Sequence, residues 1–160
     1  MNTRDPYEFT NEDQFPLGLP VVAALSGFTD AGGTITQVTE SIFAHLETSQ
    51  FVRFSNDALL DYRSRRPVMF FERDHISSYE PPILALDLVQ DEAGQSFWFL
   101  HGYEPDFAWE SFAQGLMELF DTLAVSQLVW VHSIPFPVPH TRPLGITVSG
   151  TRKDLIDRYS

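Results

Sequence analysis

The sequence contains no cysteine and a single lysine, Lys153, and each absence excludes classes of protein. Without cysteine there are no disulfides and no thiolate metal ligands, so a reducing compartment is expected. The formal net charge of −12 argues against nonspecific binding to nucleic acid, because that binding needs Lys and Arg to neutralise phosphates. The same charge argues against binding to anionic membrane surfaces.

Long apolar runs are missing as well. Every run is interrupted well before the roughly 18 residues that a membrane-spanning helix needs. Residues 1–16, MNTRDPYEFTNEDQFP, lack the basic and apolar regions of a secretory signal. We therefore expect a cytoplasmic protein without nucleic-acid or membrane partners.

The residues that are present predict one folded domain. The chain has 160 residues, of which 43% are hydrophobic, enough for a core of its own. Residues 1–17 are polar and acidic, so we expect an N-terminal arm, followed by a single α/β domain over residues 18–160. The 14 phenylalanines favour an aromatic core, and an aromatic oligomer or partner interface is the alternative.

Hydrophobic periodicity predicts the elements of this domain. Continuous or alternating apolar residues predict strands over 19–26, 51–54, 67–73, 83–90, 95–102, 126–133 and 144–150, with the first and the sixth buried. Helical spacing predicts helices over 34–46 and from Asp106 to Ala124, a helical turn over 57–60 and a further helix after residue 150. This order of elements predicts a three-layer α/β sandwich with a mixed, mostly parallel sheet.

Three unusual loops each follow a predicted strand: SGFTDAGG (26–33), HGYEPDFAW (101–109) and SIPFPVPHTRP (133–143). In open α/β sheets, ligands bind beyond the carboxyl ends of parallel strands. We therefore expect the three loops to share one edge of the sheet. The candidate residues of a ligand- or partner-binding cleft at this edge are Gly27, Asp30, Gly32, Glu104, Asp106, His140 and Arg142.

Asp30 lies in a strand-to-helix turn whose glycines match neither GxGxxG nor the P-loop pattern. A carboxylate at the start of a helix accepts backbone N–H bonds, so capping is the favoured role. A ligand contact and a catalytic base are the alternatives. Asp106 is likewise predicted to cap the helix that follows it. Gly115 within that helix costs about 1 kcal/mol relative to alanine, which indicates close packing there.

Arg63, Arg65 and Arg66 lie together in the segment DYRSRRP. One interpretation is an ion-pair network with nearby acidic residues, and the other is a site for an anion or an acidic partner. Arg142, held between prolines in PHTRP, is open to the same two interpretations. His101, at the end of an apolar strand, is expected in the core or at its rim.

Patterns of catalytic and metal sites are missing from the sequence. It contains neither GxSxG nor HExxH, and its histidines lack the spacing of metal ligands. We therefore predict no catalytic residue, no metal and no cofactor. Acid/base catalysis by a pair of carboxylates stays open, because such a pair need not be adjacent in sequence.

The segments GFTDAGG, RSRRP, HGYEPDFAW and PHTRP, in this order, resemble the bacterial and archaeal branch of the proteasome assembly chaperone family, the branch named after the second eukaryotic assembly chaperone. The resemblance runs from about Pro20 to Pro143. The positions that match the motifs of the family are Gly27, Asp30, Gly32, Arg63, Arg66, Pro67, Glu104, Asp106, Trp109, Pro139, His140, Thr141, Arg142 and Pro143.

This resemblance implies an α/β fold related in layout to nucleoside phosphorylases. It also implies association into a homo-oligomer, and a role in assembling proteasomes or other complexes through protein partners. The alternative function is binding of, or catalysis on, a small anionic, nucleotide-like ligand at the strand ends.

Two features of the chain depart from the family. Its members are usually much longer, so the chain is expected to be a fragment or a truncated product. Eukaryotic relatives dock on the proteasome ring through a C-terminal tail of a hydrophobic residue, tyrosine and any residue. Here Tyr159 matches, but Arg158 stands at the hydrophobic position.

Overall fold

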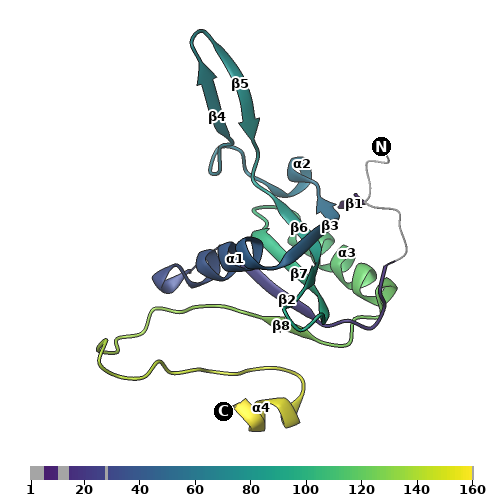
Figure 1. The fold of residues 1–160 in the computed structure, drawn as a ribbon, viewed down its shortest axis with the longest axis vertical. Helices are drawn as coiled ribbons and strands as arrows, with labels where there is room; N and C mark the ends of the chain where they lie inside the picture. Colours follow the sequence, from purple (N-terminus) through teal and green to yellow (C-terminus); the bar gives the residue numbers. More distant parts are fainter. Residues whose placement is uncertain (1–5, 11–14, 28, 160) are drawn as a thin grey trace.

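The computed structural model describes residues 6–10, 15–27 and 29–159, so the predicted arm over 1–17 lies partly outside the described residues. A six-stranded sheet forms the body of the molecule, with strands in the order β1-β3-β6-β7-β2-β8 (Figure 1). Its strands are β1 (Tyr7–Phe9), β2 (Val21–Ser26), β3 (Glu47–Phe54), β6 (Leu84–Gln90), β7 (Ser96–Tyr103) and β8 (Leu128–Trp130).

The sheet is mixed, as predicted, but antiparallel pairs predominate over parallel ones. β2 pairs in parallel with β7 and β8, whereas β1–β3, β3–β6 and β6–β7 are antiparallel. The expectation of a mostly parallel sheet is therefore corrected. For β6 and β7 a short connection explains the difference, because a parallel pair needs a crossover of a dozen or more residues. The turn between β6 and β7 is short, and Gly94 supplies its positive φ of 78°.

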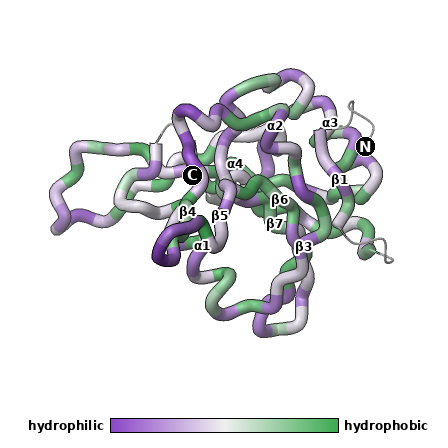
Figure 2. The backbone as a smooth tube through the Cα atoms, turned by 90° about the horizontal axis from the view of Figure 1, so that it is seen from above, coloured by the Kyte–Doolittle hydropathy of each residue, from purple (hydrophilic) through white to green (hydrophobic). Residues whose placement is uncertain are grey.

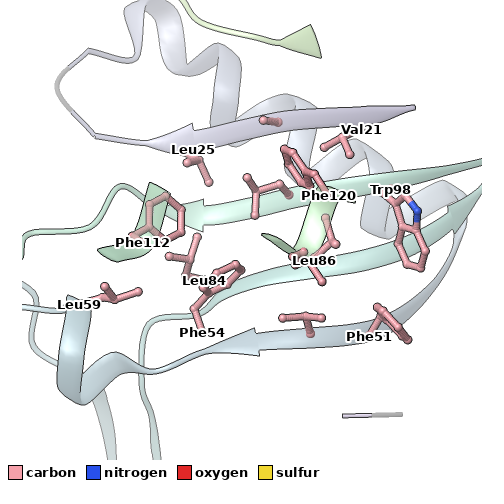
Figure 3. Close-up of a cluster of buried hydrophobic side chains, with 14 of the residues drawn as sticks. Val21, Leu25, Phe51, Phe54, Leu59, Leu84, Leu86, Trp98, Phe112 and Phe120 are labelled. Carbon is pink, nitrogen blue, oxygen red and sulfur yellow. The ribbon is translucent and has the colours of Figure 1, made fainter. Parts of the chain in front are cut away.

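The α/β class is confirmed, and each of the two long helices packs on a different face of the sheet. Side chains alternate between the faces along each strand. On one face, Val21 and Leu25 pack with Leu86, Trp98 and other buried residues against α3 (Trp109–Thr122), as Figure 3 shows. The neighbouring side chains face α1 (Thr34–His45), which a 3-10 turn, η1 (Ala31–Gly33), precedes. In Figure 2 the hydrophobic colour follows β6 and β7 through the middle of the molecule.

Close packing at Gly115 is confirmed. A Cβ built on Gly115 would lie 2.5 Å from Cγ of Pro6, so the missing side chain lets the segment before β1 approach α3. α3 itself begins at Trp109, three residues later than expected, because Ala108 takes a left-handed conformation with φ of 52°. The short helix α2 (Asn56–Leu59) agrees with the predicted helical turn.

The predicted strand over 67–73 forms as β4 (Val68–Glu72), but it lies outside the six-stranded sheet. Its partner is β5 (His75–Glu80), a strand that the sequence did not predict. Every residue of both strands is exposed. Figure 1 shows this hairpin projecting from the body of the molecule.

The C-terminal part departs most from prediction. The buried strand expected over 126–133 is the short β8, and all its residues are exposed because it is the edge strand of the sheet. No strand forms over 144–150, where Leu144 is 90% and Ile146 is 81% exposed. An apolar run becomes a buried strand only where another element covers it. The helix expected near the end forms as α4 (Lys153–Tyr159).

Candidate functional site

Asp30 caps α1, as the sequence predicts. Its Oδ1 accepts a hydrogen bond from the Ile35 N–H at 2.8 Å, and its Oδ2 accepts one from the Thr36 N–H at 3.3 Å. Gly32 and Gly33, with φ of 69° and 67°, let the chain turn between the carboxylate and the helix. The backbone bond from Ile35 is the main reason why the pKa of Asp30 lies below its ordinary value.

Asp30 also holds the first loop against the third. The Ser133 hydroxyl donates to Oδ1 of Asp30 at 3.2 Å, and the two residues form a parallel β-bridge. The Thr29 hydroxyl donates to the carbonyl of Ser133 at 3.0 Å and lies 3.3 Å from Nε2 of His132. The first and the third loop therefore begin at the same end of the sheet.

The first loop meets the second at Gly27. A Cβ added to Gly27 would overlap the side-chain carboxylate of Glu104, so the Glu104 side chain in its present position lies close to the Gly27 backbone. The Glu104 N–H donates to the carbonyl of Ser26 at 2.9 Å. This contact continues the parallel pairing of β2 and β7 past the end of β7.

Arg65 and Asp106 form an ion pair, with Nη2 3.2 Å from Oδ1. Nη1 of Arg65 also donates to the carbonyl of Glu104 at 2.9 Å, and the guanidinium lies 5.4 Å from the ring centroid of Tyr103. Oδ2 of Asp106 accepts the Asp61 N–H at 2.8 Å. The predicted capping role of Asp106 is therefore wrong, because its carboxylate fixes the arginine segment instead of the helix.

Tyr103 lies between the arginine segment and α2. Its hydroxyl donates to Oδ1 of Asn56 at 2.6 Å, and burial, the largest effect, raises the pKa of Tyr103 to about 12. The neighbouring residues 61–65 form a turn, in which the Ser64 and Arg65 N–H groups donate to the carbonyl of Asp61. The ion-pair interpretation therefore holds for Arg65.

A pocket of about 360 Å³ opens beside this cluster, between α1 and the ends of β6 and β7. Ile35, Thr39 and Glu40 line it from α1, and Arg65, Ile83 and His101 line it from the other side. The volume is that of a small-molecule site. Its place, beyond the carboxyl ends of the parallel strands β2 and β7, is where ligands bind in open α/β sheets.

His101 is buried, in line with the predicted core or rim position. Its Nε2 lies 3.3 Å from Oδ1 of Asp87, and the two side chains are 9% and 7% exposed. Neither of these two atoms makes a hydrogen bond to a described residue, although the distance is that of an ion pair. The imidazole stacks on Phe99 at 5.2 Å between ring centroids, and Phe43 meets it edge-on at 4.9 Å.

The remaining predicted residues lie apart from this cluster. His140 and Arg142 are exposed in the segment after β8, and within the described residues neither side chain makes a hydrogen bond or an ion pair. Arg63 and Arg66 are exposed on the segment that leads to the β4–β5 hairpin. The structure thus brings together Gly27, Asp30, Glu104, Asp106 and Arg65, while the binding roles of all these residues stay predictions.

Two residues at or behind the pocket were not singled out from the sequence: Glu40, which lines it, and Asp87, which lies against His101. Glu40 resembles any exposed residue of a helix, so the sequence around it does not indicate a binding site. Asp87 did carry one, because a carboxylate within the apolar run ILALDLVQ is unusual.

Comparison with known proteins places these observations in a family. The sequence model of the PAC2 family matches residues 24–160, most of the chain. The chain belongs to the PAC2 family. The resemblance based on the four sequence motifs is therefore confirmed. A comparison with curated proteins gives no significant match.

Solved structures of similar proteins share the fold. A Mycobacterium tuberculosis protein of unknown function, Rv2714, superposes with a TM-score of 0.87 at 36% identity over 98% of this chain. A Corynebacterium glutamicum protein of unknown function gives 0.82 at 27% identity over 96%. The M. tuberculosis proteasome-assembly chaperone homologue Rv2125 gives 0.71 at 25% identity over 78%. The chain spans 55%, 66% and 53% of these three proteins.

Membrane-spanning helices and metal sites were considered for residues 6–10, 15–27 and 29–159 alone. Among them, no helix is both long and apolar enough to cross a membrane. In the same part of the chain, no group of three or more His, Cys, Asp or Glu residues is arranged to hold a metal ion.

Proposed function

We propose that this protein assists the assembly of a protein complex related to the proteasome, by binding a partner protein. Membership of the PAC2 family and similarity to a proteasome-assembly chaperone homologue support this function. One observation, the exposed apolar side chains of the projecting β4–β5 hairpin, favours this hairpin as the binding surface.

The hairpin exposes large apolar side chains on both of its strands. Phe71 is 70%, Tyr79 59% and Val68 57% exposed, and Met69, Phe70 and Ile76 are exposed with them. Folded monomers rarely leave so many large apolar groups together in water, and such groupings mark interaction sites. Aromatic residues and methionine are also the residue types enriched in protein interfaces.

Charge indicates the kind of partner. Residues 62–80 contain four arginines and three carboxylates in a chain whose net charge is −12. Arg63 and Arg66 are exposed where the chain enters the hairpin. The hairpin therefore suits an apolar protein surface with carboxylates at its rim, where complementary charge speeds association.

The test is affinity purification of the tagged chain from its native host, with quantification of proteasome subunits by mass spectrometry. The variant Phe71→Ser/Tyr79→Ser should lower their recovery at least about tenfold, as expected when interface anchors are lost. Ile146→Ser, which alters an equally exposed apolar residue elsewhere, should leave recovery unchanged. Absence of proteasome subunits, or equal recovery with the hairpin variant, would overturn the proposal.

Self-association is part of the same proposal and has its own measurement. Light scattering during size-exclusion chromatography should give a mass above that of one chain. The mass of a single chain at all concentrations would refute self-association. A cytoplasmic location, without nucleic-acid or membrane partners, also belongs to the proposal and rests on the acidic charge.

A further inference from the structure

The pocket between α1 and the ends of β6 and β7 is a second candidate binding site, and its assignment does not depend on the hairpin. It holds about 360 Å³, and Ile35 and Ile83 give it apolar walls. This is room for a ligand with a small apolar body. The charge of that ligand follows from the polar groups that line the pocket.

The arginine of the pocket is already engaged. Arg65 is paired with Asp106 at 3.2 Å and donates to the carbonyl of Glu104 at 2.9 Å. Its positive charge is therefore neutralised within the protein, and an anionic ligand would have to compete with Asp106. An anion is accordingly the ligand that this pocket suits least.

Two acceptors of the pocket, in contrast, are unused. Within the described residues, the Glu40 carboxylate and the Thr39 hydroxyl make no hydrogen bond or ion pair. A carboxylate without a partner attracts a cation, and a hydroxyl accepts hydrogen bonds from it.

His101 provides the second, independent observation. Its side chain is more than nine-tenths buried, lines the pocket, and turns Nε2 toward Oδ1 of Asp87. Within the described residues neither atom completes a hydrogen bond, and Nδ1 has no partner either. Buried polar groups are normally satisfied, so each exception calls for an explanation. A proton on Nε2, the nitrogen that faces Asp87, would leave the Nδ1 lone pair able to accept a hydrogen bond.

We propose that this pocket binds a small primary amine, with the ammonium group between Glu40 and Nδ1 of His101 and the apolar body against Ile35 and Ile83. The ammonium donates three hydrogen bonds, which match the unused acceptors. The buried Asp87 carboxylate orients the imidazole and adds negative charge behind it.

The test uses three probes of the same size and different charge: n-butylammonium, n-butanol and butyrate. Each is titrated into the 15N-labelled full chain, and amide shifts are followed by NMR. Butylammonium should shift the amides of Thr36, Thr39 and Gly102 in a saturable way, with at least about threefold tighter binding than either other probe. Long-range 15N spectra should show the Nδ1 resonance of His101 moving with the same dissociation constant.

A pair of variants tests the charge. Glu40→Gln should weaken butylammonium binding about two- to fivefold, the range expected for an exposed ion pair. Glu110→Gln makes the same change on α3, which packs on the other face of the sheet, and should have no effect. Both sites are exposed, so both variants should fold normally.

Three results would overturn the proposal. Tighter binding of butyrate would make the pocket an anion site centred on Arg65. Equal binding of butanol would make it a purely apolar site. No saturable shift with any probe at the pocket amides would mean that it binds none of these classes.

Discussion

Replacing Arg65 by alanine should destabilise the protein much more than the same replacement at the adjacent Arg66. Arg65 donates to the carbonyl of Glu104, pairs with Asp106 and lies over the ring of Tyr103. Arg66 is exposed and has no hydrogen-bond or ion-pair partner among the described residues. The two positions thus compare the same side chain in two environments.

The magnitude follows from the three contacts of Arg65. A hydrogen bond from a charged donor contributes about 1.5–3 kcal/mol, and a cation–π contact about 0.5–1 kcal/mol. An exposed ion pair adds about 0.2–1 kcal/mol. The Arg65 side chain is 31% exposed, so solvent screening favours the lower ends of these ranges. We expect Arg65→Ala to cost about 2–3 kcal/mol and Arg66→Ala less than about 0.5 kcal/mol.

Equilibrium unfolding in urea measures both values, with the slope of the transition checked for constancy. Combining Arg65→Ala with Asp106→Ala in a double-mutant cycle should give a coupling energy of about 0.5–1 kcal/mol. Equal losses at positions 65 and 66, or a coupling near zero, would refute the assignment of Arg65 as the residue that holds this loop in place.

Two further predictions concern the Asp30 carboxylate and the backbone at Gly102. Because the pKa of Asp30 is lowered, chiefly by the Ile35 N–H, its contribution to stability exists above the unfolded pKa of about 3.9 and is lost as pH falls through the lower folded pKa. Between about pH 5 and pH 2 the melting temperature should therefore fall less steeply for Asp30→Asn than for the parent protein. An equal fall in melting temperature for the two proteins would contradict the capping role. Gly102→Ala should cost at least about 2 kcal/mol in urea unfolding, because φ is 119° and the new Cβ would overlap the carbonyl of Ile83, whereas Gly145→Ala, in open space, should change little. Similar values for both alanine variants would count against the described approach of β6 and β7.

Local patterns predicted much of the central sheet and both long helices. The apolar run that became β2 ends at Gly27, and the helical spacing that became α1 starts after two glycines with positive φ. The Asp30 cap was predicted for the same reason, since its hydrogen bonds lie within six residues. These features depend on short-range geometry, so the residues involved are neighbours in the sequence.

Features that depend on distant residues were missed. Asp106 looked like a helix cap, but Arg65, 41 positions earlier, takes its carboxylate. The run over 126–133 looked buried, but it became an exposed edge strand because no described element covers it. The pairing of β4 with β5 likewise depends on a partner strand whose own sequence, HISSYE, carries little apolar signal.

The loop SGFTDAGG (26–33) contains features that local sequence determines and features that depend on the tertiary structure. Its glycines and Asp30 were sufficient to predict a capped turn, because a turn is built from hydrogen bonds and φ angles within a few residues. The residues that contact this loop are decided by the sheet, because parallel pairing of β2 with β7 and β8 brings Glu104 and Ser133 next to it. The pocket beside it, with His101 turned toward Asp87, likewise depends on the register of β6 and β7, which short-range patterns do not specify.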